Sequence, residues 1–434
     1  MKVRFQTKKI VVCLFTLYLF WGLKPYFTWS TFKDGIFGDL LGVNYSSIFL
    51  LLSLIAIFIT QNKLKLNNFS QKYSIFTFLC GLLLIGICGL NFKNLFSFEW
   101  LAYISIIIWI CMPHDERVSI YNLYLTLFAV TLIPSIIYFT LRIINVSIPY
   151  DIVESVEVLK NDHGFSYTHY PFAIQLRHQL VALANIRLCG IYDEAGKLGT
   201  VAALFLTSEQ YKLKKKWRNI IIFIAGILSM SVGFYVLTLA YFILSNISKR
   251  KFKNAVYIIA MVLTYIVFIN IPIKNQYISS IQSRIIITSS GLSGDNRTND
   301  AYNTVYKEVY EDPLALLIGY GSVAMGEKQD ELLIDGASYK SLIYSFGFLG
   351  FGISLVWLLV YSIHYKKVTK NRYIWVIFII YLLNIYQRPS AFFPPYLMIA
   401  LGGIEKLESD MKNSLNIKSI KDRNQLRQKE FETT

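Results

Sequence analysis

The chain has 434 residues, of which 54% are hydrophobic, 16% aromatic and only 16% charged. A chain of this length with so little charge cannot hide its apolar surface in one water-soluble core, so the composition excludes an ordinary soluble domain and predicts a polytopic membrane protein. The net charge of +16 is explained by basic residues in short loops that meet anionic lipid headgroups, and no nucleic-acid partner is expected.

Twelve apolar segments are predicted to be transmembrane helices, because a bilayer core takes roughly 17–25 apolar residues per helix and only helices satisfy every backbone polar group within one segment. In chain order they are 10–26, 40–60, 73–90, 96–112, 120–141, 198–211, 220–230, 232–244, 255–273, 341–363, 373–386 and 393–404. The stretch 220–244 also suits one long tilted helix. However, basic segments (KLKKKWR and SKRKFK) flank it on both sides, and short basic loops stay cytoplasmic, so two crossings are predicted between them.

This topology predicts a single integral membrane domain, 1–434, with both termini in the cytoplasm, including the basic tail 405–434. The basic start MKVRFQTKK precedes an apolar run without a small-residue cleavage site, so an uncleaved first span is expected. Two large hydrophilic loops, 142–197 and 274–340, are predicted to lie together on the opposite, periplasmic face. That pairing indicates where the chemistry takes place.

The first loop contains PFAIQLRHQLVALANIRLCG, whose apolar residues are spaced for one face of a helix lying along the membrane surface. These residues are Phe172, Leu176, Leu180, Leu183 and Ile186. Next comes GIYDEAGKLG, where Gly196 permits a tight turn beside Asp193 and Glu194, which predicts the rim of a pocket. Arg187 and Glu194 are predicted to be functional, because ionisable groups next to the bilayer need partners and often mark substrate paths.

No metal is expected in this loop. Its histidines, His163, His169 and His178, lack the compact two-histidine spacing of a zinc helix, and no cysteine cluster accompanies them.

The second loop predicts a helix in DNRTNDAYNTVYKEVYEDP. Asp300 is a candidate N-cap, and Asp312 ends the helix before Pro313. One helix face carries Tyr302, Val305, Tyr306 and Val309.

Arg297 lies just ahead of this helix, where its guanidinium and the free N–H groups can converge on one anion. Gly319 and Gly321 are expected to form a flexible turn, a pattern too common to indicate a nucleotide site. The acidic residues that follow, including Glu331 and Asp335, lead to the tenth span.

Two periplasmic loops, each with an arginine and carboxylates close to the bilayer, suit a lipid-anchored pyrophosphate that carries sugars. A carboxylate would take a proton from an acceptor hydroxyl as it attacks the anomeric carbon, and the arginines would stabilise the leaving pyrophosphate. This scheme needs no metal and no cofactor.

Five segments resemble a known family, the bacterial O-antigen polymerases and the related O-antigen ligases. They are RLCGIYDEAGKLGT, LSMSVG, DNRTNDAYNTVYKEVYEDPLALLIGYG, SYKSLIYSFGFLGFG and QRPSAFFPPYLMIALGG, in this order between Arg187 and Ile404. The first half of the chain is similar only in its span pattern.

The resemblance implies an all-helical, inverting glycosyltransferase of the GT-C type in the bacterial inner membrane. Such enzymes transfer a growing glycan from undecaprenyl pyrophosphate to the next undecaprenyl-linked repeat unit on the periplasmic side. The resemblance also implies that Arg187, Arg297 and Arg388 hold pyrophosphate, and it puts Glu194 in the matching glutamate position. A chain-length regulator and a flippase are the expected protein partners.

Two positions depart from the family pattern. Val232 follows Ser231 where relatives often have an arginine, and Asp335 is the ionisable residue near SYKSLIYSFGFLG where ligases have a histidine. The second departure disfavours a ligase and leaves the catalytic base open among Asp335, Glu331 and Glu194. The alternative functions are a ligase that transfers polysaccharide to lipid A core and a flippase for the same lipid-linked sugar. A flippase would carry charges at mid-membrane depth and show two related halves, and neither is visible here.

Overall fold

A computed structural model describes most of the chain. The described residues are 2–28, 43–60, 71–90, 101–154, 164–178, 187–214, 216–248, 300–332, 338–388 and 394–432, with isolated positions between 263 and 292. Over these residues the protein is mostly helical. The helices are α1 (Lys2–Gly22), α3 (Val43–Thr60), α4 (Gln71–Leu90), α6 (Leu101–Cys111), α7 (His114–Ile143), α9 (Ala195–Ser208), α10 (Trp217–Leu228), α11 (Val232–Ser248), α14 (Asp300–Glu311), α15 (Pro313–Ile318), α16 (Ser322–Glu331), α17 (Tyr339–Thr369), α18 (Tyr373–Gln387) and α19 (Pro394–Glu432), with a short 3-10 turn at Tyr26–Thr28.

Eleven of the twelve predicted spans coincide with helices, while the ninth, 255–273, falls largely outside the described residues. The stretch 220–244 forms two helices, because α10 ends at Leu228 and α11 begins at Val232 after a turn in which Met230 has a φ of 47°. Within the described part of the chain, α7 and α17 are long and apolar enough to cross a membrane, and several other apolar helices are shorter.

At the centre of the bundle, α19 packs against α7, α9 and α18, and α9 packs against α18. Small residues let the backbones approach closely. A side chain at Gly402 of α19 would collide with Tyr121 of α7, and one at Gly403 would collide with Ser208 of α9. Close packing of this kind fixes the position of α19 relative to the other two helices.

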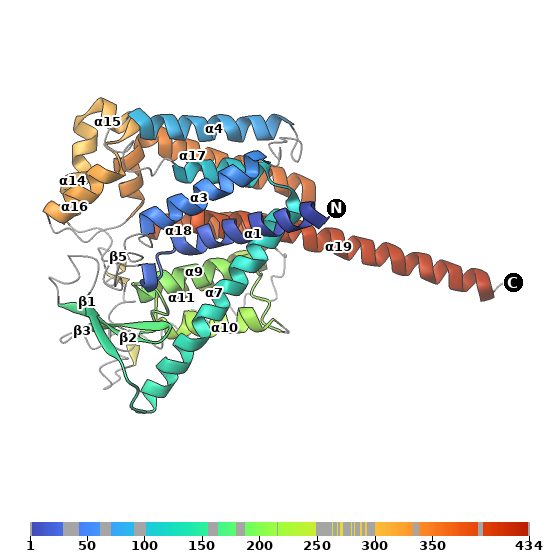
Figure 1. Ribbon diagram of the computed structural model, residues 1–434, viewed down its shortest axis with the longest axis horizontal. Helices are drawn as coiled ribbons and strands as arrows, with labels where there is room; N and C mark the ends of the chain where they lie inside the picture. The colour runs from blue at the N-terminus through green and yellow to red at the C-terminus, as the bar shows by residue number, and fades with distance from the viewer. Residues whose placement is uncertain are drawn as a thin grey trace.

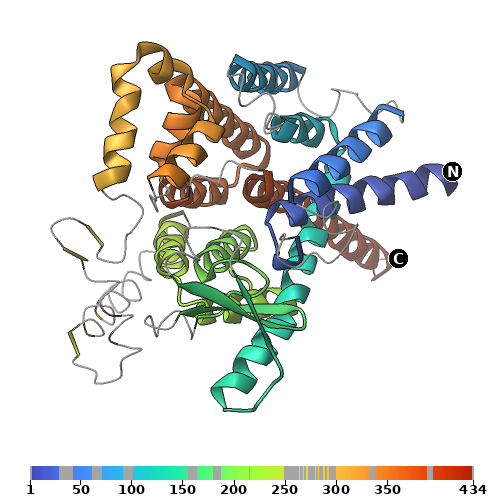
Figure 2. The same ribbon diagram turned by 60° about the vertical axis from the view of Figure 1, so that its left-hand side comes forward.

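The two ends of the bundle differ. Figure 1 shows the N-terminus, and the end from which α19 projects, on one side, and the strands together with α14–α16 on the other. We call the first the tail end and the second the capped end. In Figure 2 the strands and α14–α16 occupy separate sides of the capped end, where strand β3 contacts α7 and α14–α16 contact α17. Both large insertions therefore contribute to the same end.

The first insertion folds as a three-stranded antiparallel sheet of β1 (Asp151–Glu154), β2 (Phe165–Tyr170) and β3 (Ala173–His178), in which Tyr167 pairs with Leu176. The predicted surface helix is therefore wrong over 173–178, and the all-helical expectation is corrected with it. The physical reason is that the segment fits a period of two as well as a helical face, and the turn at Phe172, with a φ of 60°, folds it back as a hairpin. The remainder of the predicted helix, 179–186, lies outside the described residues. A second small sheet pairs β4 (Ile287–Thr288) with β5 (Gly291–Leu292).

In the second insertion the predicted helix is confirmed as α14, which starts at Asp300 itself. Val305 and Val309 are buried, as the apolar face predicts. Asp312 caps the next helix, since its side chain accepts a hydrogen bond of 2.9 Å from the Leu314 amide at the start of α15.

The turn that follows α15 is pinned to α17. The amides of Tyr320 and Gly321 donate to the carbonyls of Tyr344 and Ser345, at 2.8 and 3.0 Å. Gly319 and Gly347 have φ angles of 78° and 64°, and a side chain at either would collide with the backbone of the other segment. These bonds correct the expectation of a flexible turn, and the non-helical Gly347 accounts for the kink in α17.

Candidate functional site

The segment that leads into α9 at the capped end is fixed by four surrounding elements. The Ile174 amide of β3 donates to Gly190 (2.8 Å), the Tyr26 amide donates to Ile191 (2.8 Å) and the Leu188 amide donates to Leu228 (3.0 Å). The Tyr167 hydroxyl of β2 donates to the carbonyl of Asp193 at 2.7 Å. The backbone that carries Arg187 and Glu194 is therefore rigidly placed by β2, β3, α10 and the turn after α1.

Arg388 and Glu194 meet at this end. Nη2 of Arg388, just after α18, donates to Oε2 of Glu194, just before α9, at 2.9 Å. The Arg388 side chain is 10% exposed and the Glu194 side chain 32%. The buried Nε of Arg388 has no hydrogen-bond partner among the described residues. Burial by itself would lower the pKa of the Arg388 guanidinium, but the negative charge of Glu194 more than offsets this and the pKa is raised.

A second ion pair uses the neighbouring carboxylate, Asp193. Nζ of Lys197, in the first turn of α9, is 2.8 Å from Oδ1 of Asp193. Glu194 occupies the N-cap position of α9, yet its side chain makes no capping bond and reaches Arg388 instead. The first N–H groups of α9 have no acceptor within the helix. This place therefore combines two cations, two carboxylates and the positive end of a helix dipole, a combination suited to phosphate.

Arg187 is anchored at the same end. Its Nε donates to the carbonyl of Ser229, in the turn between α10 and α11, at 3.1 Å. Gly199 of α9 lies so close to this turn that a side chain there would collide with Ser229 and Ser231. Arg187 is thus held beside α9 by a turn that packs directly on the helix.

The other predicted site residues are placed as follows. Arg297 and Asp335 lie outside the described residues. Glu331 is the last residue of α16 and is exposed on the second insertion. Gly196 lies inside the first turn of α9, which corrects its assignment to a loop turn, because the helix already begins at Ala195.

Sequence reasoning missed Lys197. The signal that marks it is the spacing of Asp193 and Lys197, since charges four residues apart meet on a helix face.

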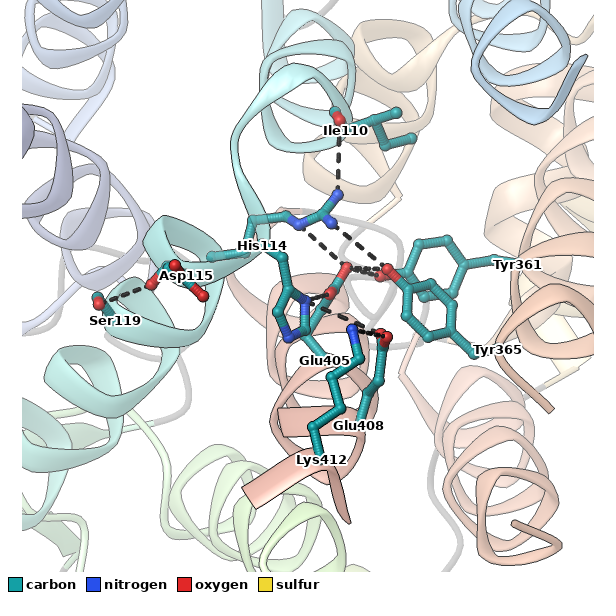
Figure 3. A network of polar contacts seen from close by, with 10 residues as sticks. Ile110, His114, Asp115, Ser119, Tyr361, Tyr365, Glu405, Glu408 and Lys412 are labelled. Carbon is teal, nitrogen blue, oxygen red and sulfur yellow. Dashed lines mark hydrogen bonds and ion pairs between the residues drawn. The ribbon is translucent and has the colours of Figure 1, made fainter. Parts of the chain in front are cut away.

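A larger polar cluster, which sequence reasoning missed entirely, lies at the tail end. Glu405 of α19 is fully buried, and its Oε1 accepts hydrogen bonds from the hydroxyls of Tyr361 (2.6 Å) and Tyr365 (2.5 Å) of α17. Figure 3 shows both tyrosines pointing at this carboxylate. The same oxygen is 3.1 Å from Nε of Arg117 of α7, and Oε2 is 2.6 Å from Nδ1 of His114. The cluster ties α7, α17 and α19 together.

By arrangement, His114, Glu405 and Glu408 are able to hold a metal ion, since their ligand atoms lie within 4.8 Å of one another. Their charges are already balanced, however. Arg117 pairs with Glu405, and Nζ of Lys412 lies 2.6 Å from Glu408. A divalent cation would have to displace or repel these cations, so the cluster acts as an ion-pair lock between helices.

Comparisons of the chain with models of protein families, with curated proteins and with solved structures found no match. Function is therefore inferred from the residues themselves.

Proposed function

We propose that this protein is a multi-pass bacterial inner-membrane glycosyltransferase that polymerises O-antigen or capsular repeat units. It transfers a glycan from undecaprenyl pyrophosphate to the next undecaprenyl-pyrophosphate-linked unit on the periplasmic face. The observation that carries the proposal is the contact of 2.9 Å between Arg388 and Glu194 at the start of α9. A guanidinium suited to phosphate and a carboxylate suited to proton transfer meet there, at the end where both large insertions lie.

Exposed apolar faces support a lipid environment. On α4 the exposed large residues recur every three or four positions along one side of the helix: Ile75, Phe78, Leu79, Leu82 and Leu83. A contiguous apolar face on a helix surface favours contact with lipid over contact with water. We therefore propose that α4, α17 and the other long apolar helices of the bundle cross the membrane.

The distribution of basic residues supports the orientation. Lys212, Lys214 and Lys216 lie in the short connection between α9 and α10, which Figure 1 shows at the tail end, on the side of the bundle from which α19 projects. Short basic loops stay cytoplasmic. The capped end then faces the periplasm, where the lipid-linked substrate is presented.

In the proposed reaction, the guanidinium of Arg388 binds the donor diphosphate, with Arg187 and Arg297 as further phosphate-binding candidates. The acceptor hydroxyl oxygen attacks the anomeric carbon from the side opposite the diphosphate. The bond between that carbon and the diphosphate oxygen breaks, and its electron pair leaves with the diphosphate. A carboxylate, for which Glu194 is the described candidate nearest to Arg388, takes the hydroxyl proton.

The test compares two arginines at the two ends of α18. Arg388 follows the helix at the capped end, and Arg372 precedes it at the tail end. In a strain lacking the gene, Arg388→Gln should leave lipid A with a single repeat unit on a lipopolysaccharide gel, while Arg372→Gln should restore long chains at the same protein level.

Long chains with Arg388→Gln would contradict the proposal. In the deletion strain, loss of every repeat unit from lipid A would indicate a ligase instead, and lipid-linked units retained on the cytoplasmic leaflet would indicate a flippase.

A further inference from the structure

At the start of α9, two cations are each covered by a carboxylate. Arg388 and Lys197 have side chains that are only 10% and 12% exposed, whereas their partners Glu194 and Asp193 are 32% and 20% exposed. The cations are thus the deeper layer and the carboxylates the outer one. A ligand approaching from solvent therefore meets the carboxylates first.

Two independent features leave donors at this place for an anion. The Nε of Arg388 is buried without a hydrogen-bond partner among the described residues, which is costly for a charged donor. In addition, the residue at the N-cap position of α9, Glu194, does not cap the helix, so the first N–H groups of α9 lack the side-chain acceptor that a cap provides. A single carboxylate oxygen on Arg388 satisfies only part of this donor set.

A diphosphate can satisfy more of it. It offers several oxygens and more negative charge than one carboxylate, and it binds a guanidinium through two parallel bonds while further oxygens reach an ammonium group and a helix N-terminus. Competition for Arg388 and Lys197 therefore favours the diphosphate over the two side chains that now occupy them.

We infer that Glu194 and Asp193 hold the places of diphosphate oxygens, and that a diphosphate binding to Arg388, Lys197 and the start of α9 displaces Glu194, which then serves as the catalytic base. The assignment of a base rests on the proposed function, whereas the exchange of anions does not. Two consequences follow. Lys197 is a further phosphate-binding residue, and Glu194 is the catalytic base rather than Glu331 or Asp335.

The exchange also makes the catalytic base available only when the donor is bound. A carboxylate paired with a guanidinium is a weaker base than a free one. Before substrate arrives, Glu194 is engaged by Arg388, so the site holds no free carboxylate at this position. After the diphosphate takes Arg388, the released carboxylate is partly exposed and next to the bound donor. Deprotonation of the acceptor is thereby coupled to the presence of the donor.

The test measures inorganic pyrophosphate binding to the purified full-length protein in detergent by calorimetry. Glu194→Gln removes the competing charge but keeps the shape, so it should bind pyrophosphate about tenfold more tightly than the unaltered protein while losing polymer formation in cells. Asp193→Asn should tighten binding in the same direction by releasing Lys197. Lys197→Met should weaken it about tenfold.

The matched control is Glu308→Gln, which removes a carboxylate from the exposed pair with Lys328 on the second insertion and should leave pyrophosphate binding unchanged. If Glu194→Gln binds pyrophosphate equally or more weakly, the exchange is overturned. If Lys197→Met leaves the affinity unchanged, the role of Lys197 is overturned.

Two further arms distinguish the source of the phosphate. A short-chain prenyl diphosphate should compete with pyrophosphate, whereas phosphatidylglycerol in nanodiscs should not. Competition by phosphatidylglycerol alone would overturn the diphosphate site in favour of a headgroup site.

If cells lacking the protein still make long chains and Glu194→Gln nevertheless binds pyrophosphate more tightly, the proposed function fails and the anion site stands. If Arg388→Gln abolishes long chains but Glu194→Gln does not bind pyrophosphate more tightly, the proposed function stands and the exchange of anions fails.

Discussion

The two ends of the bundle each pair an arginine with a glutamate, but the surroundings of the two pairs differ. At the tail end, Arg117 and Glu405 are 2% and 0% exposed, and Glu405 also binds two tyrosines and a histidine. At the capped end, Arg388 is 10% and Glu194 32% exposed. We call the first pair saturated, because the buried Glu405 carboxylate already has four side-chain partners, and the second exchangeable, because the Glu194 carboxylate is partly exposed.

The difference has a physical meaning. Desolvating an ion pair is repaid only when hydrogen bonds satisfy the remaining polar atoms, and a buried carboxylate that already has four partners leaves a ligand no position to take. An ion pair at an accessible surface gains when a better anion replaces its carboxylate. The tail-end cluster therefore holds helices together, whereas Arg388 at the capped end can exchange the Glu194 carboxylate for another anion.

The largest effect is expected from breaking the saturated pair. Glu405→Ala leaves Arg117 buried without a counter-ion, which typically costs about 3–5 kcal/mol, so little folded protein should be recovered and its unfolding temperature in detergent should fall sharply. The control is Glu408→Ala on the same helix, which removes the contact with the exposed Lys412 and a contact of 3.9 Å with His114 but leaves Arg117 its buried counter-ion. An unfolding temperature of Glu405→Ala within the error of the control would show that the cluster does not hold the helices.

A smaller loss tests whether saturation itself matters. Tyr361→Phe removes one of the hydroxyls that donate to Glu405 and keeps the ring, so it should lower the free energy of unfolding by about 1.5–3 kcal/mol, the contribution of a hydrogen bond to a charged group. Tyr365→Phe should act similarly. Unfolding in increasing denaturant, followed by tryptophan fluorescence, measures both. A change below the error of the method in both variants would mean that Glu405 is satisfied without the tyrosines.

The helical part of this architecture was predictable because it depends on local patterns. Apolar runs of sufficient length predicted the helices, and the α14 face with Val305 and Val309 was read correctly from its spacing. The sheet was not predicted, because Phe172 and Leu176 are four residues apart, as on a helix face, and the same segment also satisfies the alternation of a hairpin. Whether the segment folds as a helix or as a hairpin depends on distant partners such as Gly190, and the sequence alone does not identify them.

The site was only half predictable for the same reason. Arg388 and Glu194 were each singled out, but residues 194 positions apart cannot be paired from periodicity or spacing. By sequence, Arg117 lies in a short connection between two predicted spans, and its burial against Glu405 arises from the packing of α7 on α19. Long-range contacts of this kind decide which charges are structural and which remain available for a ligand.

The capped-end pair should respond to the same chemical change in a different way. Arg388→Gln removes one charged hydrogen bond, but the Glu194 carboxylate that it leaves behind is partly exposed and can be hydrated, so the stability should change by no more than about 1 kcal/mol. Arg117→Gln should cost about 3–5 kcal/mol, because it leaves Glu405 buried without its cation. Unfolding temperatures of the two variants, measured side by side, compare the clusters directly. Equal losses would remove the distinction between a saturated and an exchangeable pair.

The smallest effect is expected for an ion pair that is exposed on both sides. Glu308 of α14 and Lys328 of α16 lie 3.4 Å apart at the capped end, with side chains 40% and 37% exposed. Because exposed ion pairs contribute about 0–1 kcal/mol and are screened by salt, Lys328→Met should leave the unfolding temperature nearly unchanged at low and at high salt. Polymer length should also stay unchanged. If Lys328→Met shortens the polymer, any positive charge at the capped end would suffice for binding. The buried position of Lys197 and Arg388 would then not be what separates a binding cation from a surface one.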